Sequence, residues 1–150
     1  TCSFIIPSIL SWIKCILFSF INKAFKEHAI DLSIEQFIVL KVLTKNNGKP
    51  QNDLALITES DKTSLSRLIR TMEKKGLISR KSIKTDKRVK TIYLTNYGEK
   101  TYLSTLPLLK KTIEKFQKGI SDTEIFQAIE TIKKIQLNIS KEHSFTLWEK

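Results

Sequence analysis

The chain has 150 residues and a formal net charge of +11 at pH 7, so it is long enough for one hydrophobic core and is strongly basic. Two cysteines and the lack of any low-complexity tract exclude a disulfide-rich scaffold and a disordered chain, while the charge suits an anionic partner such as nucleic acid. We therefore predict a single domain over residues 1–150.

Residues 4–21 are apolar enough to raise the question of a membrane span. The segment is about long enough to cross a bilayer, but Lys14 divides it, and Pro7 and three serines dilute it. No positively charged leader or cleavage site accompanies it. The favoured interpretation is a helix over residues 7–29 that is buried among other helices, and a membrane segment is the alternative.

Two shorter helices are predicted next. Ser33 and Gln36 have the spacing of a capping box, which begins a helix that runs to about Thr44. Residues 45–49 contain Asn-Asn-Gly and predict a turn, after which Pro50 begins a short helix and residues 58–60 form a tight turn. This order predicts a helix-turn-helix whose second helix follows directly.

That second helix is the most informative stretch of the chain. Apolar residues at i, i+3, i+4 and i+7 predict one buried face: Leu65, Leu68, Ile69 and Met72. Ser60 or Asp61 supplies the N-cap, and Gly76 ends the helix near residue 75. The opposite face carries short hydroxyls and basic groups that suit base edges and phosphates in a major groove: Lys62, Thr63, Ser64, Ser66, Arg67 and Arg70.

A basic hairpin is predicted after this helix. Residues 77–83 and 89–94 are rich in β-branched or large apolar side chains, and the tip between them carries Lys84, Lys87 and Arg88. Residues 45–95 hold 13 Lys and Arg against 5 Asp and Glu, which places +8 of the net charge in this third of the chain. Charge concentrated in this way favours nucleic acid over general solubility as its explanation.

Two long helices complete the prediction. Thr95 caps a helix that runs to about residue 118 with a kink at Pro107, and Ser121 with Glu124 forms a second capping box that begins a helix to about residue 140. Both helices have an apolar side although the core lies elsewhere. We therefore expect them to form a two-fold dimer together with the first helix.

The residues around the predicted hairpin resemble a known family. Arg67 and the Glu-Lys-Lys-Gly-Leu ending at residues 73–77, followed by Asp86-x-Arg88 and, after five residues, by Leu-Thr-x-x-Gly at residues 94–98, resemble the MarR (multiple antibiotic resistance regulator) family over residues 30–139. This resemblance implies a mainly α fold with a small β-hairpin wing. Residues 33–95 would form the winged helix-turn-helix lobe, and residues 7–29 and 96–140 a helical dimerisation lobe.

The resemblance also implies a function. The expected protein is a cytoplasmic, non-enzymatic transcription factor. It acts as a homodimer and places two recognition helices in successive major grooves of a pseudo-palindromic operator in double-stranded DNA. Arg88 would enter a minor groove, with Asp86 orienting it. Repression is the favoured outcome of binding.

Two kinds of signal are implied by the family. Small aromatic ligands often bind between the dimer helices and the DNA-reading lobe, and the candidate residues here are Trp12, Phe20, Phe37 and Tyr102. Some members sense organic peroxides through a first-helix cysteine, which makes Cys15 a candidate redox residue. Cys15 lies 18 residues before Ser33, nearer than that pattern requires, so a buried structural thiol is the favoured interpretation.

Motifs of catalytic and cofactor sites are missing from the sequence. It has no phosphate-binding Gly-rich loop, no His-Glu-x-x-His and no Cys-x-x-Cys, and its only histidines, His28 and His143, are far apart and predicted at the surface. We expect no enzyme activity, no cofactor and no metal. Two alternatives remain: a winged-helix module that binds a protein or binds DNA without sequence preference, and a membrane-anchored regulator.

Overall fold

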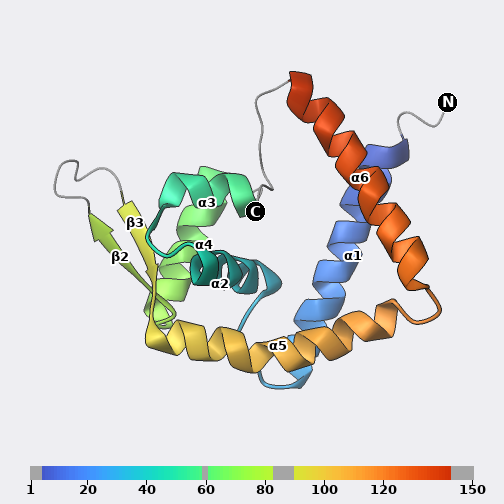
Figure 1. Cartoon of the computed structure of the whole chain (residues 1–150). Helices are drawn as coiled ribbons and strands as arrows, with labels where there is room; N and C mark the ends of the chain where they lie inside the picture. Colours follow the sequence, from blue (N-terminus) through green and yellow to red (C-terminus); the bar gives the residue numbers. More distant parts are fainter. Residues whose placement is uncertain (1–4, 59–60, 83–89, 143–150) are drawn as a thin grey trace. The chain divides into compact units, whose positions relative to one another are not determined.

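The computed structural model describes residues 5–58, 61–82 and 90–142. Within those ranges the chain forms six helices and three short strands in the order α1 (Ile5–Glu27), α2 (Ile34–Lys45), β1 (Lys49–Pro50), α3 (Gln51–Thr58), α4 (Lys62–Lys74), β2 (Ile78–Ser82), β3 (Lys90–Leu94), α5 (Asn96–Phe116) and α6 (Asp122–Glu142) (Figure 1). The predicted mainly α fold with a small hairpin is confirmed. Backbone contacts divide the chain into two compact units, Thr1–Thr112 and Ile113–Lys150.

The core of the first unit joins the helix-turn-helix to its supporting helices. The apolar spacing of α4 buries Leu65, Ile69 and Met72, as predicted, while Leu68 is half-buried. These side chains belong to one cluster with fully buried residues from α1, α2, α3 and the two long strands: Phe25, Val39, Leu40, Leu43, Leu54, Ile78 and Ile92. Burial on this scale fixes which face of α4 is left for solvent.

Three aromatic rings extend this core toward α5. The rings of Phe25 and Phe37 lie 6.3 Å apart between centroids, and those of Phe37 and Tyr102 lie 5.0 Å apart, both in tilted arrangements. Tilted pairs at these separations are favourable for aromatic side chains. The end of α1, the start of α2 and the first half of α5 are therefore packed through one aromatic contact series.

The three strands form an antiparallel sheet in the order β1-β3-β2. The predicted hairpin is confirmed in its described part, with Ile78 opposite Leu94 and Ser82 opposite Lys90. Strand β1 was not predicted: Lys49 was expected in a turn and Pro50 at the start of a helix, but Lys49 pairs with Ile92 and Pro50 with Thr91. Proline is tolerated there because an edge strand need not use its N–H on the outer side.

The side chain of Asn47 explains this added strand. Its Oδ1 accepts hydrogen bonds from the backbone N–H groups of Leu94, at 2.8 Å, and Gly48, at 3.0 Å. Gly48 has a φ of +78°, which side chains rarely allow. The turn therefore lies against the end of β3, and the two residues after it align with that strand.

The long helices agree with the prediction within a few residues. α5 continues through Pro107 and ends at Phe116, and Gly119 then adopts a φ of +82°. The capping box before α6 is formed, since Glu124 Oε2 accepts from the Ser121 N–H at 2.8 Å and from its hydroxyl at 2.7 Å. These hydrogen bonds, the hydroxyl one foremost, lower the pKa of Glu124.

The first helix is less covered than expected. Ile21 and Phe25 are buried, but large apolar side chains nearer the N-terminus are exposed in this chain: Ile9, Leu10, Trp12, Ile13, Ile16 and Phe20. Within this chain the helix is covered at Ile21 and Phe25, and the burial of its remaining apolar side chains among other helices stays a prediction for the dimer. Among the described helices, only Ser8–Glu27 is long and apolar enough to cross a membrane. This criterion uses length and composition alone, so an apolar helix that is covered by a partner protein also meets it.

Candidate nucleic-acid interface

The outer face of α4 carries the residues predicted to read DNA. Lys62, Thr63, Ser64, Ser66, Arg67 and Arg70 are all exposed. At about 100° per residue, Thr63, Arg67 and Arg70 lie opposite the buried side chains, and Ser64 and Ser66 flank them on either side. Lys62 lies seven residues before the buried Ile69, on the same side of the helix, and is exposed at the first residue of α4.

The start of α4 is built around Asp61, which resolves the choice between two N-cap candidates. Asp61 Oδ1 accepts from the N–H groups of Thr63, at 2.8 Å, and Ser64, at 2.9 Å, and its Oδ2 accepts from the Ser64 hydroxyl at 2.6 Å. The Ser64 hydroxyl bond is the largest cause of the lowered pKa of Asp61. Because the Ser64 hydroxyl donates its proton to Asp61, it can only accept a hydrogen bond from another group.

Ser66 has a partner that the sequence did not indicate. The Gln51 side-chain amide donates to Ser66 Oγ at 3.1 Å and so joins the first residue of α3 to the outer face of α4. The two residues are 15 positions apart, and no local motif links them. Gln51 therefore joins the set of polar groups next to the predicted reading face.

The guanidinium groups of Arg67 and Arg70 point to solvent without a bonding partner among the described residues. In the part of the chain that the structure describes, neither guanidinium forms an ion pair or a hydrogen bond, and both side chains are exposed. A guanidinium presents a planar set of donors that matches two acceptors at once. Both groups are thus free to meet a guanine edge or a phosphate.

The far end of α4 is held by its backbone. The Leu77 N–H donates to the Met72 carbonyl at 3.0 Å, and the Gly76 N–H to the Glu73 carbonyl at 2.9 Å, with Gly76 at a φ of +72°. This is the Schellman arrangement that a glycine after the helix predicts. It sets the direction in which the chain leaves for β2.

An ion pair joins α4 to the wing. Arg80 on β2 bonds Glu73 Oε2 through Nε, at 2.8 Å, and through a terminal guanidinium nitrogen. These hydrogen bonds are the largest cause of the lowered pKa of Glu73. Sequence analysis assigned no role to Arg80; the pairing shows that this arginine connects the wing to the helix and is not a free basic group.

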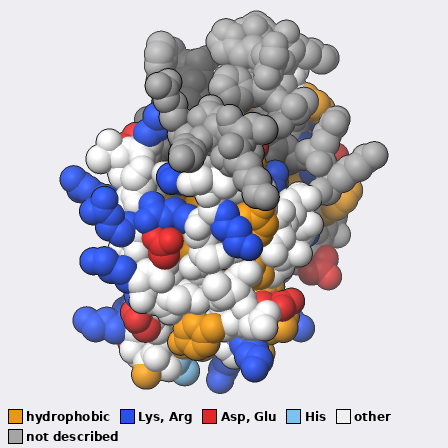
Figure 2. Space-filling view, turned by 90° about the vertical axis from the view of Figure 1, so that its left-hand side faces the viewer, with side chains coloured by type: hydrophobic (Ala, Val, Ile, Leu, Met, Phe, Trp, Pro, Cys, Tyr) orange, Lys and Arg blue, Asp and Glu red, His pale blue; other side chains and the backbone are white. Residues whose placement is uncertain are grey.

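The wing tip lies outside the described residues, and with it the predicted contacts Lys84, Asp86, Lys87 and Arg88. Two lysines that were not among the predicted DNA contacts, Lys81 and Lys90, lie on either side of it in the sequence. Lys90 Nζ donates to Ser82 Oγ across the hairpin at 2.7 Å, and Lys81 Nζ lies 4.8 Å from the centroid of the Tyr93 ring. Figure 2 shows Lys and Arg side chains spread over the face that carries the two long strands, with fewer acidic ones among them.

The Leu-Thr-x-x-Gly segment connects this interface to α5. Thr95 Oγ1 lies 2.6 Å from the Gly76 carbonyl oxygen and 3.0 Å from that of Leu77, and it accepts from the Gly98 N–H at 3.0 Å. Thr95 is therefore both the cap of α5 and a tie to the junction of α4 and β2. These contacts give a physical reason for the spacing of threonine and glycine in the motif.

The four aromatic effector candidates are not gathered in one place. Phe37 is buried and touches the half-buried Tyr102, whereas Trp12 and Phe20 are exposed on α1. An open hollow of about 160 Å³ lies elsewhere, and none of the four lines it. Its lining is largely polar and comes from α2, β3 and the start of α5: Leu43, Thr44, Asn47, Leu94, Thr95, Asn96 and Glu99.

The remaining candidates are Cys15 and the histidines. Cys15 is a free thiol and is exposed in this single copy. Its burial therefore stays a prediction that requires the proposed dimer to cover α1. His28 is exposed, and its Nδ1 lies 2.9 Å from the Ala24 carbonyl oxygen; His143 and Cys2 lie outside the described residues. Among described residues, no group of three or more His, Cys, Asp or Glu could hold a metal ion.

Comparison with known proteins gives consistent matches. The MarR family model matches residues 32–90. The transcriptional regulator HosA of Escherichia coli O157:H7 is 28% identical over 105 residues, which cover 70% of this chain and 78% of HosA. The family match runs from α2 into the hairpin.

Solved structures extend the likeness over most of the chain. A SlyA-like transcription regulator from Listeria monocytogenes is 31% identical with a TM-score of 0.76, over 90% of this chain and 89% of that one. CouR from Rhodococcus jostii RHA1, solved bound to p-coumaroyl-CoA, has a TM-score of 0.72 over 87% of this chain and 90% of CouR, and at 23% identity it shares the fold.

Proposed function

Because this chain belongs to the MarR family and is a DNA-binding transcription regulator, we propose that it acts as a homodimeric repressor on a pseudo-palindromic operator. The observation that carries the proposal is the outer face of α4, where Arg67 and Arg70 are exposed beside Thr63 and Ser66 and their guanidinium groups bond to no residue that the structure describes. Short hydroxyls and free guanidinium groups on one helix face suit base edges and phosphates together.

The proposed roles differ along this face. Thr63, Ser66 and Arg67 lie at or near base edges, with Ser64 accepting hydrogen bonds at the margin, and Lys62 and Arg70 bind phosphates. In the wing, Arg88 enters a minor groove with Asp86 orienting it, and Lys84 and Lys87 add charge near the backbone. Two such lobes would read half-sites whose centres are about 10 bp apart, or a multiple of that spacing.

The proposed dimer is supported by apolar side chains that the chain itself leaves uncovered. On α6 they are Phe126, Ile129, Ile132, Leu137 and Ile139, and on α1 they include Trp12, Ile13 and Ile16. Exposed apolar surface of this extent is typical of interaction sites. A second copy of the chain is the occupant that a two-fold DNA-binding protein requires.

Selection from a random duplex pool tests the proposal. At about 0.15 M salt, purely electrostatic binding is weakened, so enrichment reports base reading. We expect a two-fold symmetric motif. Enrichment of no sequence, with or without an added aromatic ligand, would contradict operator recognition and leave a winged helix that binds proteins or DNA without sequence preference.

We further propose control by a small aromatic ligand near Phe37 and Tyr102, where α2 meets α5. The tilted ring pair of Phe37 and Tyr102, with centroids 5.0 Å apart, supports this position because aromatic groups already pack there. CouR, which shares the fold, was solved with p-coumaroyl-CoA. Ligand binding there would be detected as a change in Tyr or Trp fluorescence and as release from the operator. Replacement of Tyr102 by leucine should reduce both responses.

One observation favours a second candidate, a membrane-anchored regulator. Ser8–Glu27 is apolar over the length of a bilayer span and is largely uncovered in this chain. We propose the cytoplasmic dimer ahead of it, because Lys14 interrupts the apolar run and Lys23 follows it. Fractionation of cells distinguishes the two: the dimer is recovered with soluble protein, and an anchored regulator with membranes.

A further inference from the structure

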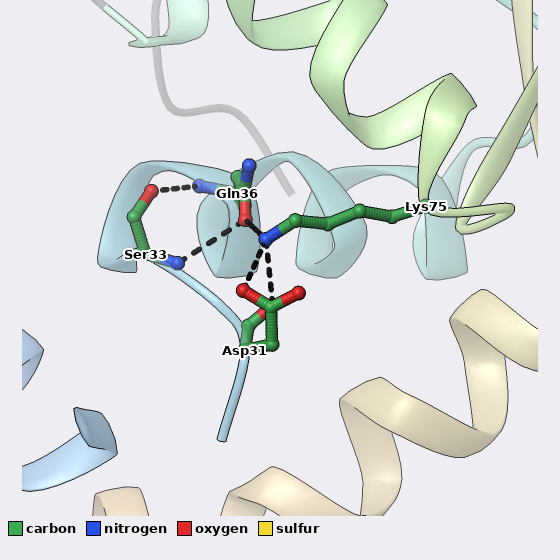
Figure 3. Close-up of polar contacts among 4 residues, drawn as sticks. All are labelled: Asp31, Ser33, Gln36 and Lys75. Carbon is green, nitrogen blue, oxygen red and sulfur yellow. Dashed lines mark hydrogen bonds and ion pairs between the residues drawn. The ribbon is translucent and has the colours of Figure 1, made fainter. Parts of the chain in front are cut away.

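A polar cluster ties the end of α4 to the segment between α1 and α2 (Figure 3). The Lys75 ammonium bonds Asp31 Oδ1 at 2.7 Å and the Asp31 backbone carbonyl oxygen at 2.9 Å, and it lies 3.4 Å from Gln36 Oε1. All three of its hydrogens therefore have acceptors. Asp31 is 44 residues before Lys75, so the cluster is a tertiary link and not a feature of one helix.

The link is anchored firmly at its α4 end. Lys75 is the C-cap of α4, and its own N–H bonds the Thr71 and Glu73 carbonyls. Its side chain is only 26% exposed, whereas that of Asp31 is 87% exposed. Because Gly76 follows in the left-handed region, a shift of Lys75 requires a shift of the helix end itself.

At its other end the link reaches α1. Gln36 Oε1 also accepts from the Ser33 N–H at 3.2 Å, which places it in the capping box of α2. The next N–H, that of Ile34, donates to Asn22 Oδ1 on α1 at 2.8 Å. A continuous set of hydrogen bonds thus runs from α1, through the first turn of α2, to the C-terminal end of α4.

We propose that Lys75 is a positioning residue for sequence-specific DNA binding: through Asp31 and Gln36 it holds α4 at a set orientation to α1, and it does not contact DNA. The inference rests on the proposed function, because it requires α4 to read bases. Base hydrogen bonds need closely defined donor positions, whereas flexible basic side chains still reach phosphates after a small rotation of the helix. Loss of the link should therefore reduce specific binding more than non-specific binding.

Asp31→Ala separates this role from charge effects. The change removes a negative charge from the DNA-binding unit, so electrostatics alone predicts equal or tighter binding to any duplex. Positioning predicts the opposite for the motif that the wild type selects: about threefold weaker binding, with affinity for a scrambled duplex of equal length not reduced. Lys75→Met removes all three contacts and should weaken specific binding by about fivefold.

The neighbouring lysine provides a matched control. Lys74 has the same charge and lies on the same side of α4 as Arg67, at i+7, but it is exposed and bonds to no described residue. Lys74→Met should act equally on both duplexes. If Lys75 positions the helix, Lys75→Met should keep the wild-type slope of log Kd against log salt concentration. The double variant Asp31→Ala, Lys75→Met should then bind no more weakly than Lys75→Met alone.

Each outcome bears on the inference. The inference would be overturned by tighter specific binding of Asp31→Ala or by additive losses in the double variant. It would also be overturned if the salt slope of Lys75→Met fell by about 0.9, because that decrease marks a lost phosphate contact. Asp31 is exposed, so Asp31→Ala keeps the test available if Lys75→Met fails to fold. If the wild type itself selects no motif, the proposed function fails; if it does and the variants retain its specificity, only the positioning role fails.

Discussion

Gly98 lies against the backbone carbonyl of Leu77 so closely that a Cβ built on Gly98 would stand 2.0 Å from the carbonyl oxygen. The same oxygen accepts the Thr95 N–H at 3.2 Å. The first turn of α5 is thereby seated directly on the junction between α4 and β2. Only a residue without a side chain permits this approach.

Gly98→Ala should destabilise the fold by about 3 kcal/mol, because the added methyl group meets backbone that cannot move without displacing α4 or β2. Urea unfolding followed by circular dichroism measures the change. Lys100→Ala, at an exposed position in the same helix, is the control and should alter stability by less than about 0.5 kcal/mol. A Gly98→Ala protein as stable as the wild type would mean that this contact relaxes freely.

The pair between Glu73 and Arg80 predicts a dependence of stability on pH. The Arg80 hydrogen bonds hold the pKa of Glu73 below its ordinary value of 4.5. The pair therefore contributes fully above that value, and its contribution is lost as the pH falls through the lower pKa of the folded state. Glu73→Gln should cost less than about 1 kcal/mol at neutral pH, since both side chains are about a third exposed.

That difference between the wild type and Glu73→Gln should shrink below pH 4.5, and urea unfolding across the acid range measures it. Glu114→Gln removes an exposed carboxylate elsewhere, on α5, and is the control measured over the same range. A Glu73→Gln difference that stays constant through the acid range would show that Arg80 does not stabilise the charged carboxylate.

Arg67 and Lys62 should respond differently to replacement by alanine. Loss of a base-reading arginine should cost about 1 to 3 kcal/mol at its cognate base pair and relax selection at that position. Loss of Lys62, for which we propose a phosphate contact, should weaken binding to all sequences alike and reduce the salt slope by about 1. Titration of selected and scrambled duplexes measures both, and an equal loss on the two duplexes for Arg67→Ala would contradict base reading.

The exposed side chains of α6 give a prediction about assembly. If the proposed dimer buries this face, Ile129→Glu should shift the protein from dimer to monomer, because a carboxylate buried in an apolar interface loses its hydration without a partner. Gln127→Glu introduces the same charge at an exposed site roughly opposite on the helix, so it should leave the dimer intact. Sedimentation velocity distinguishes the two states, and a dimeric Ile129→Glu protein would place the interface elsewhere.

Features governed by neighbouring residues could be predicted from the sequence. The capping box at Ser33, the N-cap at Asp61, the buried spacing of Leu65, Ile69 and Met72, and the glycine end of α4 all obey rules that operate within one or two turns. The same rules located the hairpin strands to within two residues. These elements suffice to place α4, the proposed recognition helix, and its outer face.

Features that depend on distant residues could not be predicted in this way. Strand β1 exists because Asn47 bonds Leu94, 47 residues later, and the pairing of Lys75 with Asp31 spans 44 residues. Arg80 on the wing pairs with Glu73 on α4, and no motif in the sequence predicts this ion pair. Exposure of Cys15 likewise depends on what covers α1, which no periodicity in α1 specifies.

Pro50 has a consequence for how the protein behaves when concentrated. It stands in β1, at one edge of the three-stranded sheet, and it offers no N–H to an approaching strand. At the opposite edge, β2 presents the charged side chains of Arg80 and Lys81. Both edges of the sheet are therefore poorly suited to pairing with a strand of another molecule, which disfavours association through the sheet.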